Sequence, residues 1–486
     1  MTSRRLTVLA TVAATACTGL VTLGSTAAAD PAPSSLKLMA PRHATAYVFH
    51  KRAFLDFSVG IEAVAQNFEL WSHRANFHSP ITTELRRGAT DTDLPAGLMT
   101  DFTGLPKFFD VSIADSTGKV VLHRRPTVCL DGSEIRVVPD GAAHSPYPPY
   151  GCPYNIFTKG SVQGIAAGWA TEIPVLGYRS AKLAKGTYTV TTKIASTYRS
   201  LFGISAPDAT GTTSLTVKKI RCDKGCGPVP VPVGGSGATS SSANVHPSPA
   251  LKPSEHLAHA PTTGPEPDLE ALPAWGIQVS KGGNYLQFSA TVWNGGDSPM
   301  VVQGFHTNRR HVLKSYQYFY DTDGNQVGYV RAGHMDWDAA PTHHHWHFAD
   351  FAQYRLLDAN KDGVVRSQKD GFCLANTDAI DYTIPGANWN PDNTDLQTDC
   401  GDLDSPSVTE VLAAGSGDTY EQFRAGQSFS LKNLKNGIYY VSIEANPNNV
   451  LTEQSMTNNT ALRKVRIGGT PDHRTVYVYP KGDVTG

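Results

Sequence analysis

The chain has 486 residues, of which 40% are hydrophobic and 17% are charged, and its formal net charge is −1 at pH 7. This length accommodates two or three domains, each able to bury its own hydrophobic core. The balanced charge provides neither a basic surface for nucleic acid nor an electrostatic attraction to a membrane, so we expect no partner of either class.

The N-terminal segment 1–29 has the organisation of a secretory signal peptide. Arginines occupy positions 4 and 5, residues 6–23 form a mostly apolar body, and three alanines at 27–29 provide a small-residue cleavage site. A twin-arginine export signal and a lipoprotein anchor at Cys17 are the alternatives. No later apolar run approaches the ~20 residues that span a bilayer, so we expect a secreted, extracellular and soluble product.

Cysteine usage agrees with export, because removal of Cys17 with the signal leaves six of the seven cysteines. An even number predicts three disulfides. The alternative for the closely spaced pair at 222 and 226 is half of a metal site, but no second cysteine pair completes it. Proximity in sequence favours the pairs Cys129–Cys152, Cys222–Cys226 and Cys373–Cys400.

Residues 36–220 contain short apolar runs separated by Gly, Pro and Asp. Segments 108–113 and 187–194 have sequences typical of strands, and the strand signals of this region recur at the spacing expected for β-hairpins. No stretch shows a helical, 3.6-residue period of comparable strength. This pattern predicts an N-terminal β-sandwich domain over residues 36–226. The histidines of this region lack the spacing of metal ligands, so its role is unknown.

Composition changes sharply at residues 227–266, where Pro, Gly and Ser predict a flexible linker. The alternating segment 285–292 then begins a second β-domain, which spans residues 267–486. We therefore expect an all-β chain with two β-sandwich domains. Later strands of the second domain are predicted at 428–431, at 438–443 and, as the last one, at 460–467.

Two acidic segments of the second domain resemble calcium-binding loops. Residues 358–363 copy the first half of an EF-hand loop, but Lys369 occupies the position that requires a bidentate glutamate. Residues 321–325 lie between tyrosine-rich strands, as expected for a hairpin. Both segments are therefore predicted to be turns without calcium.

Four histidines within five consecutive positions form the strongest chemical signal. If the segment is a strand, His343, His345 and His347 share one face, and His344 and Trp346 point the other way. Same-face Cα atoms lie roughly 6.5–7 Å apart, which three imidazoles can span around one ion if the strand bends. Nitrogen ligands without cysteine suit copper or zinc, and relative affinity favours copper. The alternative is a pH-sensitive surface patch.

Segments 343–357, 369–374 and 418–420 resemble, in content and order, the catalytic domain of the lysyl oxidase family. The resemblance covers about residues 267–467 and leaves the N-terminal domain outside. The chain departs from the family pattern in four ways. It has two cysteines where animal members have more, an extra His344, one residue fewer after the histidines, and a longer tyrosine-rich segment before them.

The resemblance implies a copper-dependent amine oxidase, an oxidoreductase of the protein-lysine 6-oxidase type. The family's copper ligands fall on His343, His345 and His347, and its quinone-forming pair falls on Lys369 and Tyr420. The implied cofactors are copper and the lysine tyrosylquinone made by crosslinking that pair. The implied reaction uses dioxygen to convert a primary amine, either peptidyl lysine or a small amine, to an aldehyde with release of ammonia and hydrogen peroxide.

The chemistry of these residue types agrees with that reaction. Histidine-bound copper can activate dioxygen against a nearby tyrosine ring, and a lysine amine can add to the resulting quinone. A base must then remove the α-proton of the substrate. Three aspartates flank the histidines, and each is a candidate either for that base or for orienting a histidine ring. They are Asp336, Asp338 and Asp350.

The resemblance also implies a calcium site that joins the entry of the second domain to its last strands. Its oxygen ligands are side chains of Asp268, Glu453, Asn458 and Asn459 and the backbone carbonyl of Leu269. Because Ser455 stands where a carboxylate is expected, we predict weak binding.

Two other functions compete with the oxidase. Three histidines and a water also describe a zinc-binding hydrolase, which a visible quinone absorption band would exclude. A non-catalytic secreted adhesion-type β-sandwich protein also fits the strand pattern, and a bound transition metal would argue against it.

Overall fold

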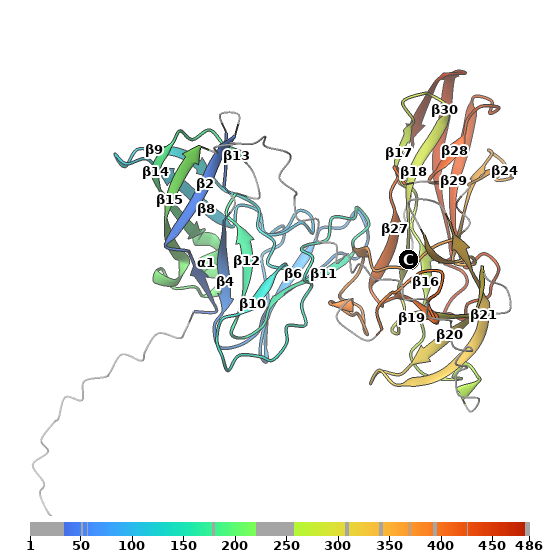
Figure 1. The fold of residues 1–486 in the computed structure, drawn as a ribbon, viewed down its shortest axis with the longest axis horizontal. Helices are drawn as coiled ribbons and strands as arrows, with labels where there is room; N and C mark the ends of the chain where they lie inside the picture. The colour runs from blue at the N-terminus through green and yellow to red at the C-terminus, as the bar shows by residue number, and fades with distance from the viewer. Residues whose placement is uncertain are drawn as a thin grey trace, which may run out of the picture. The chain divides into compact units, whose positions relative to one another are not determined.

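A computed structural model describes residues 34–49, 52–55, 57–176, 180–219, 257–306, 311–339, 344–367, 369, 371–391, 396–424 and 426–481. The chain is all-β, as predicted (Figure 1). Within these residues the helices are α1 (Ser196–Phe202) and the 3-10 turn Pro207–Ala209. None of the described helices has the length and apolar character needed to cross a membrane. The predicted signal segment and Cys222 and Cys226 lie outside the described residues.

Three sheets are built from strands that precede residue 220. The first has the order β1-β4-β12-β10 and consists of β1 (Leu36–Met39), β4 (Ser58–Ala63), β12 (Trp169–Pro174) and β10 (Glu134–Arg136). The second has the order β11-β5-β6-β7 and consists of β11 (Gly160–Ile165), β5 (Phe68–His73), β6 (Thr82–Arg87) and β7 (Thr90–Asp93). The third has the order β13-β3-β2-β15-β14-β8-β9 and consists of β13 (Ser180–Ala181), β3 (Arg52–Phe54), β2 (His43–Phe49), β15 (Thr210–Lys219), β14 (Gly186–Ile194), β8 (Phe109–Ala114) and β9 (Val120–Arg124).

The two strands predicted in this region are confirmed as β8 and β14, which pair with each other. In β8 the buried residues alternate with partly exposed ones, as expected for a strand with one face on a core. That core is one hydrophobic cluster, to which all three sheets contribute, for example through Leu38, Leu70 and Val111.

Three further sheets are built from strands that follow residue 268. The first has the order β16-β18-β27-β25, with β17 and β28 also paired to β18, and consists of β16 (Leu269–Ala271), β18 (Tyr285–Asn294), β27 (Ser416–Tyr420), β25 (Asp378–Ala379), β17 (Trp275–Val279) and β28 (Ser428–Ser430). The second has the order β22-β21-β20-β19-β26 and consists of β22 (His345–Phe348), β21 (Gln326–Asp338), β20 (Val312–Tyr320), β19 (Met300–His306) and β26 (Ser407–Leu412). The third has the order β24-β23-β29-β30-β31 and consists of β24 (Gly363–Arg366), β23 (Ala352–Leu357), β29 (Gly437–Ala445), β30 (Thr460–Thr470) and β31 (His473–Val478).

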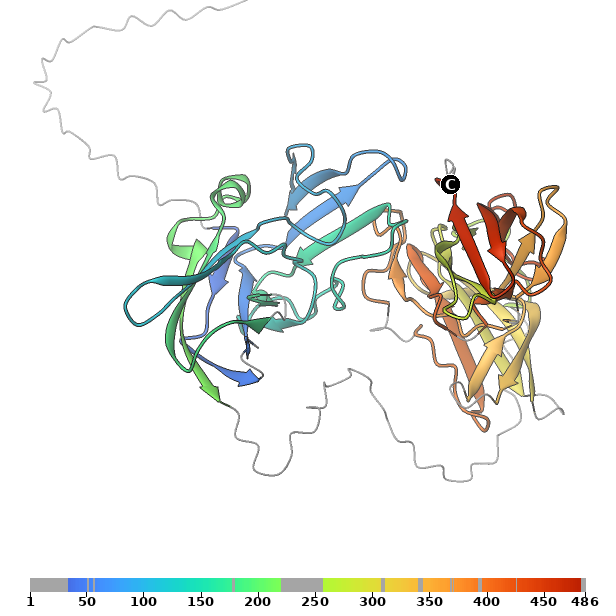
Figure 2. The same cartoon turned by 90° about the horizontal axis from the view of Figure 1, so that it is seen from above.

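The predicted strands at 285–292, 428–431, 438–443 and 460–467 correspond to β18, β28, β29 and β30. The prediction that 460–467 is the last strand was wrong, because β31 follows and pairs with β30, at the red end of the chain in Figure 2. β31 lies at the edge of its sheet and buries little, so its apolar pattern is weak.

Both acidic segments are turns, as predicted. Asp321 Oδ1 accepts hydrogen bonds from the backbone N–H groups of Asp323 and Asn325, and β20 and β21 form the hairpin around it. Asp358 Oδ1 accepts in the same way from Asn360 and Asp362. Each aspartate therefore stabilises its own turn.

Among the described strands, none from before residue 220 shares a sheet with one from after residue 268. The division into two domains and the linker at 227–266 remain predictions, because residues 220–256 lie outside the described residues.

Two of the three predicted disulfides, Cys129–Cys152 and Cys373–Cys400, are present, with Cα atoms 5.7 Å and 6.0 Å apart.

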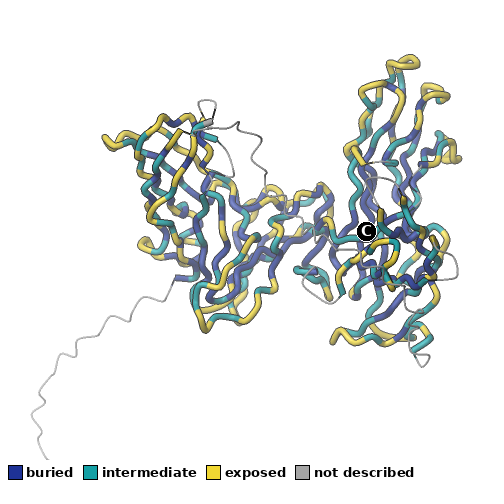
Figure 3. The backbone as a smooth tube through the Cα atoms, in the orientation of Figure 1, coloured by how far each residue is buried: buried dark blue, intermediate teal, exposed yellow. Residues whose placement is uncertain are grey.

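The core of the second region is rich in aromatic side chains. Its fully buried members include Trp346, Phe348, Tyr354 and Phe372, which lie on or beside the strand that carries the histidines. The dark blue stretches of the tube in Figure 3 follow this core along the strands. The candidate site is therefore built on rigid, buried structure.

Candidate functional site

β22 carries two histidines of the predicted motif on one face. It pairs antiparallel with β21, so that Asp338 lies opposite His345 and Asp336 lies opposite His347. The Nε2 atoms of His345 and His347 are 2.9 Å apart. Trp346 between them is fully buried. The predicted alternation is therefore correct for these three consecutive residues.

The N-terminal side of the motif departs from a regular strand. His344 is exposed and has a φ of 53°, in the left-handed region, so the extended backbone ends just before β22. The backbone thus departs from strand geometry at His344, the kind of irregularity that binding of one ion by all three histidines would require. His343 lies outside the described residues.

The two described histidines fit a bound metal ion. Nitrogen ligands at about 2.0–2.1 Å from one ion, at roughly a right angle to each other, lie about 3 Å apart. The Nε2 separation of 2.9 Å is compatible with this geometry and is also the length of a hydrogen bond between the two imidazoles. Imidazole donors suit copper or zinc.

One of the three flanking aspartates contacts a histidine of the motif. Asp338 Oδ2 lies 3.5 Å from Nδ1 of His347, which is itself 7% exposed. A carboxylate at Nδ1 fixes the ring orientation and leaves Nε2 for a metal ion. Asp338 therefore suits the orienting role, one of the two roles predicted for it.

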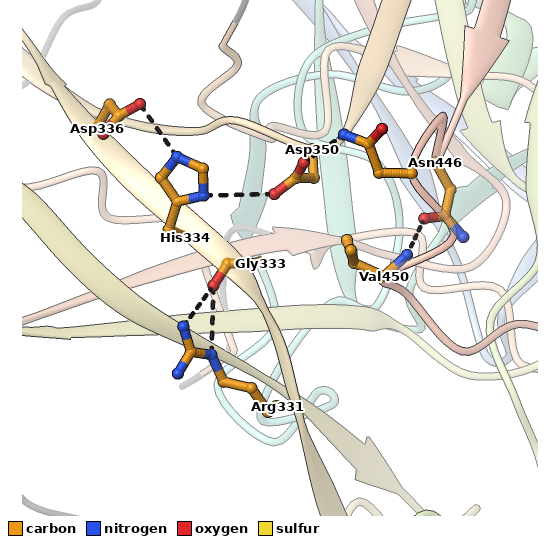
Figure 4. A network of polar contacts seen from close by, with 8 residues as sticks. Arg331, Gly333, His334, Asp336, Asp350, Asn446 and Val450 are labelled. Carbon is orange, nitrogen blue, oxygen red and sulfur yellow. Dashed lines mark hydrogen bonds and ion pairs between the residues drawn. The ribbon is translucent and has the colours of Figure 1, made fainter.

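The other two flanking aspartates contact a different histidine, His334 on β21 (Figure 4). Asp336 Oδ2 lies 3.3 Å from His334 Nε2, and Asp350 Oδ2 lies 3.6 Å from His334 Nδ1. Sequence reasoning missed His334. The alternation of His334, Asp336 and Asp338 on one face of β21 was the signal that could have found it.

The segment around Phe372 attaches directly to the histidine strand. The N–H of Phe348 donates to the carbonyl of Phe372 at 2.7 Å, and the reverse bond measures 3.1 Å. A Cβ atom on Gly371 would come within 2.8 Å of the His347 Cβ, so this approach requires glycine. Lys369, two residues earlier, is thereby held near the histidines.

The disulfide Cys373–Cys400 joins two segments that both hydrogen-bond to β22. Cys373 follows Phe372, and the carbonyl of Cys400 accepts a 3.0 Å hydrogen bond from the N–H of Trp346. The disulfide therefore restrains the segment after Lys369, and its pairing is the one predicted from the sequence.

Lys369 and Tyr420 are in contact although they are far apart in sequence. The Nζ atom of Lys369 lies 4.1 Å from the centre of the Tyr420 ring. Tyr420 ends β27, and its hydroxyl donates to the carbonyl of Cys373 at 3.2 Å. The Phe372 ring packs edge-to-face against it, with centroids 5.2 Å apart.

Burial shifts the titration of both groups. It lowers the pKa of Lys369, which is 8% exposed, to about 8, and the charge of Asp418 opposes this shift. Burial, and secondarily Asp418, raise the pKa of the Tyr420 phenol well above its usual value. A fraction of Lys369 is therefore a neutral amine near neutral pH, the form that acts as a nucleophile.

Two buried carboxyl groups lie within electrostatic range of this pair, and burial raises the pKa of each well above its ordinary value. Asp418 was part of the family resemblance without a role. Glu410 was missed, although a glutamate inside the apolar strand 407–412 is an unusual pattern that could have found it.

The residues of the predicted calcium site come together. Glu453 Oε1 accepts a hydrogen bond from Asn459 Nδ2, and Asp268 Oδ2 accepts one from Asn458 Nδ2. The side-chain carbonyl oxygens of both asparagines are buried without a hydrogen-bond partner among the described residues. Leu269 contacts the cluster through its N–H, which donates to Glu453 Oε2. Unpaired carbonyl oxygens beside carboxylates suit a hard cation.

Comparison with known proteins shows that a segment containing Lys369, Tyr420 and β22 matches a known family. The lysyl oxidase family model matches residues 297–477, a segment that begins and ends later than the resemblance predicted at 267–467. Protein-lysine 6-oxidase of Homo sapiens is 29% identical over 135 residues, which are 27% of this chain and 28% of the relative. The Sus scrofa protein of the same name is 27% identical over 135 residues, or 27% and 48% of the two chains.

Lysyl oxidase homolog 3B of Danio rerio is 27% identical over 130 residues, or 26% of this chain and 14% of the relative. The matched segment thus spans less than half the length of each of these curated relatives. Residues 297–477 of the chain form a lysyl oxidase family domain.

Proposed function

We propose that this protein is a secreted, copper-dependent amine oxidase that uses a lysine tyrosylquinone formed from Lys369 and Tyr420. The family domain supports an oxidase of the lysyl oxidase type. The observation that carries the finer proposal is the 4.1 Å contact between Lys369 Nζ and the Tyr420 ring. A covalent bond between them would require the lysine nitrogen to move from its position over the ring to a ring carbon.

His343, His345 and His347 are proposed as the copper ligands, and bound copper would supply the activation of dioxygen that oxidises the tyrosine ring. Asp338 orients His347 through its Nδ1 atom. Lys369 supplies a partly neutral amine next to the ring. Phe372 covers the ring from one side and limits its contact with water.

The proposed reaction converts a primary amine, dioxygen and water to an aldehyde, ammonia and hydrogen peroxide. A quinone formed from Lys369 and Tyr420 would supply a carbonyl group able to accept the substrate amine. The relatives named protein-lysine 6-oxidase support peptidyl lysine as a substrate, and small amines are the other candidate class. Export by the signal peptide at 1–29 would place the enzyme outside the cell, and the N-terminal domain at 36–226 would accompany it through the linker.

A calcium ion is proposed at the side chains of Asp268, Glu453, Asn458 and Asn459 and the backbone carbonyl of Leu269. The two unpaired asparagine oxygens support this assignment. Burial raises the pKa of Glu453, and a bound cation would offset the cost of its ionised form. The ion would tie the start of β16 to the entry of β30.

Peptide mapping of secreted protein that has been loaded with copper tests the function. Digestion should yield one joined peptide that contains Lys369 and Tyr420, and the intact protein should show a visible absorption band that phenylhydrazine changes. Separate, unmodified peptides from protein that binds zinc in place of copper would support the hydrolase alternative instead.

A further inference from the structure

Two buried carboxyl groups near Lys369 and Tyr420 have no role in the function proposed above. Glu410 on β26 is 0% exposed and Asp418 on β27 is 2% exposed. The Oε1 atom of Glu410 and the Oδ2 atom of Asp418 have no hydrogen-bond partner among the described residues. An unpaired carboxyl oxygen in the interior costs free energy, so its retention beside a reactive pair points to function.

Asp418 is the better placed of the two. Asp418 and Tyr420 are two residues apart in β27, opposite Val292 and Ala290 of β18, so their side chains project from the same face. Among the charged groups that act on Lys369, Asp418 has the largest effect and Glu410 has a smaller one. Lys369 is in turn the strongest charge acting on Asp418. Asp418 thus lies on the same strand face as Tyr420 and within electrostatic range of both Lys369 and the Tyr420 phenol.

Both carboxyl groups accept backbone hydrogen bonds, Asp418 from Ala375 and Glu410 from Leu374 and Phe348, so Glu410 is the more firmly held of the two. Glu410 Oε2 accepts the N–H of Leu374 at 2.9 Å, in the segment that follows Cys373. This bond holds the chain beneath the reactive pair. Glu410 therefore suits a supporting role.

We infer that Asp418 is the base that removes the proton from the carbon bearing the substrate's amino group, an inference that rests on the proposed amine oxidase function. In this step the C–H bond breaks, the proton moves to the Asp418 carboxylate, and the two electrons of that bond pass to the quinone. Dioxygen, the second substrate of the proposed reaction, later takes up these two electrons with two protons and leaves as hydrogen peroxide.

Formation of the crosslink would prepare Asp418 for this role. Before crosslinking, the Lys369 ammonium group is a buried cation that favours the charged form of Asp418. A nitrogen bonded to an aromatic ring is no longer a basic amine, so this cation is lost. Burial then raises the pKa of Asp418 with less opposition, so its ionised form is a stronger base and is populated at higher pH. The ionisable groups that remain around it are Arg424, Asp378, Glu410 and Tyr354, because the Tyr420 phenol is consumed when the quinone forms.

The test is anaerobic reduction of the crosslinked protein by a primary amine, because this half-reaction includes the proton removal and excludes dioxygen. Asp418→Asn should still form the joined Lys369–Tyr420 peptide, the visible band and the phenylhydrazine adduct, none of which requires that proton transfer. Bleaching of the band by the amine should slow about 100- to 10,000-fold, the usual contribution of a general base. Deuterium at the reacting carbon should slow the residual bleaching further.

Two additional variants make the outcome specific. Asp131→Asn removes another buried carboxyl group with an unpaired oxygen, in the first region of the chain, and should bleach at the wild-type rate. Asp418→Glu should restore part of the bleaching rate and shift the pH profile of that rate.

Bleaching at the wild-type rate in Asp418→Asn would overturn the inference. Loss of the crosslink in that variant would also overturn it, because Asp418 would then act in maturation. Absence of the crosslink from wild-type protein would instead overturn the proposed function.

Discussion

The surroundings of Tyr147 and those of Tyr420 contain similar side chains but offer different chemistry. Tyr147 is buried, and its hydroxyl donates to Glu69 Oε1 at 2.6 Å. Buried carboxyl oxygens of Asp131 and Glu134 lie in the same region without hydrogen-bond partners among the described residues. Burial raises the pKa of Tyr147, and Glu69 raises it further. Tyr420 likewise has a raised pKa and two buried carboxyl neighbours.

The difference lies in what contacts the aromatic ring and its hydroxyl. Tyr420 donates to a backbone carbonyl, and Lys369 Nζ lies over its ring. The cation–π contacts found among the described residues place no lysine on Tyr147. A buried tyrosine with acidic neighbours is therefore insufficient for the proposed cofactor, and a partly neutral amine at the ring is the distinguishing feature.

The largest effect is expected from removing the phenol oxygen at each of these positions. Tyr420→Phe should keep copper but lose the joined peptide, the visible band and amine-dependent peroxide release, because the ring can no longer become a quinone. Tyr147→Phe should keep all three. Absorption spectra and peroxide assays of the two copper-loaded variants give the answer. Peroxide release by Tyr420→Phe would exclude Tyr420 as the quinone precursor.

The two disulfides provide a second comparison, because they close loops of similar length, with sequence separations of 27 and 23. Replacing both cysteines by serine should cost about 3–4 kcal/mol in either pair by the chain-entropy model. Only the Cys373/Cys400 double variant should also reduce the yield of joined peptide, because only that disulfide flanks β22. Urea unfolding and quantitative peptide mapping measure the two effects. Equal crosslink yields would show that the disulfide does not position Lys369.

The period-two pattern was enough to predict several strands and the alternation of His345, Trp346 and His347. It placed His345 and His347 on one face and Trp346 on the other, as the structure does. It also suggested Asp338 near the motif. It could not choose among the three aspartates, since that choice depends on the register between β21 and β22.

The period-two pattern could not predict contacts between segments that are far apart in sequence. Lys369 follows β24 and Tyr420 ends β27, and no local period relates a residue in a loop to a strand of another sheet. The family resemblance supplied that pair. It gave no role to Asp418 or Glu410, because the importance of a carboxyl group there follows from burial and an unpaired oxygen, which only packing reveals.

Calcium removal should have a smaller effect than loss of a disulfide. An ion at one hundred times its dissociation constant stabilises the folded state by about 2.7 kcal/mol. Chelation by EGTA should therefore lower the melting temperature of copper-loaded protein by several degrees. Glu453→Gln should melt lower and respond little to EGTA. An unchanged wild-type melting temperature would remove the support for the site.

The smallest expected effect concerns Glu134, whose pKa burial raises to about 7. Between the ordinary glutamate pKa and 7, the folded state holds this proton more tightly than the unfolded state, so the free energy of unfolding falls as pH rises through that range. Glu134→Gln cannot ionise and should lose this contribution. Its melting temperature should therefore fall less than that of wild-type protein between pH 5 and pH 8.

Asp321→Asn is a suitable control for Glu134→Gln, because hydrogen bonds within its exposed turn lower the pKa of Asp321. Stability from such a group is present above the ordinary aspartate pKa and is lost only in acid, so this variant should match wild-type protein in its response between pH 5 and pH 8. Differential scanning calorimetry at the two pH values would detect the difference. If Glu134→Gln showed the full wild-type decrease, the carboxyl groups around Tyr147 would titrate normally, and raised pKa values would be a property of the Tyr420 surroundings rather than of buried acid clusters in both regions.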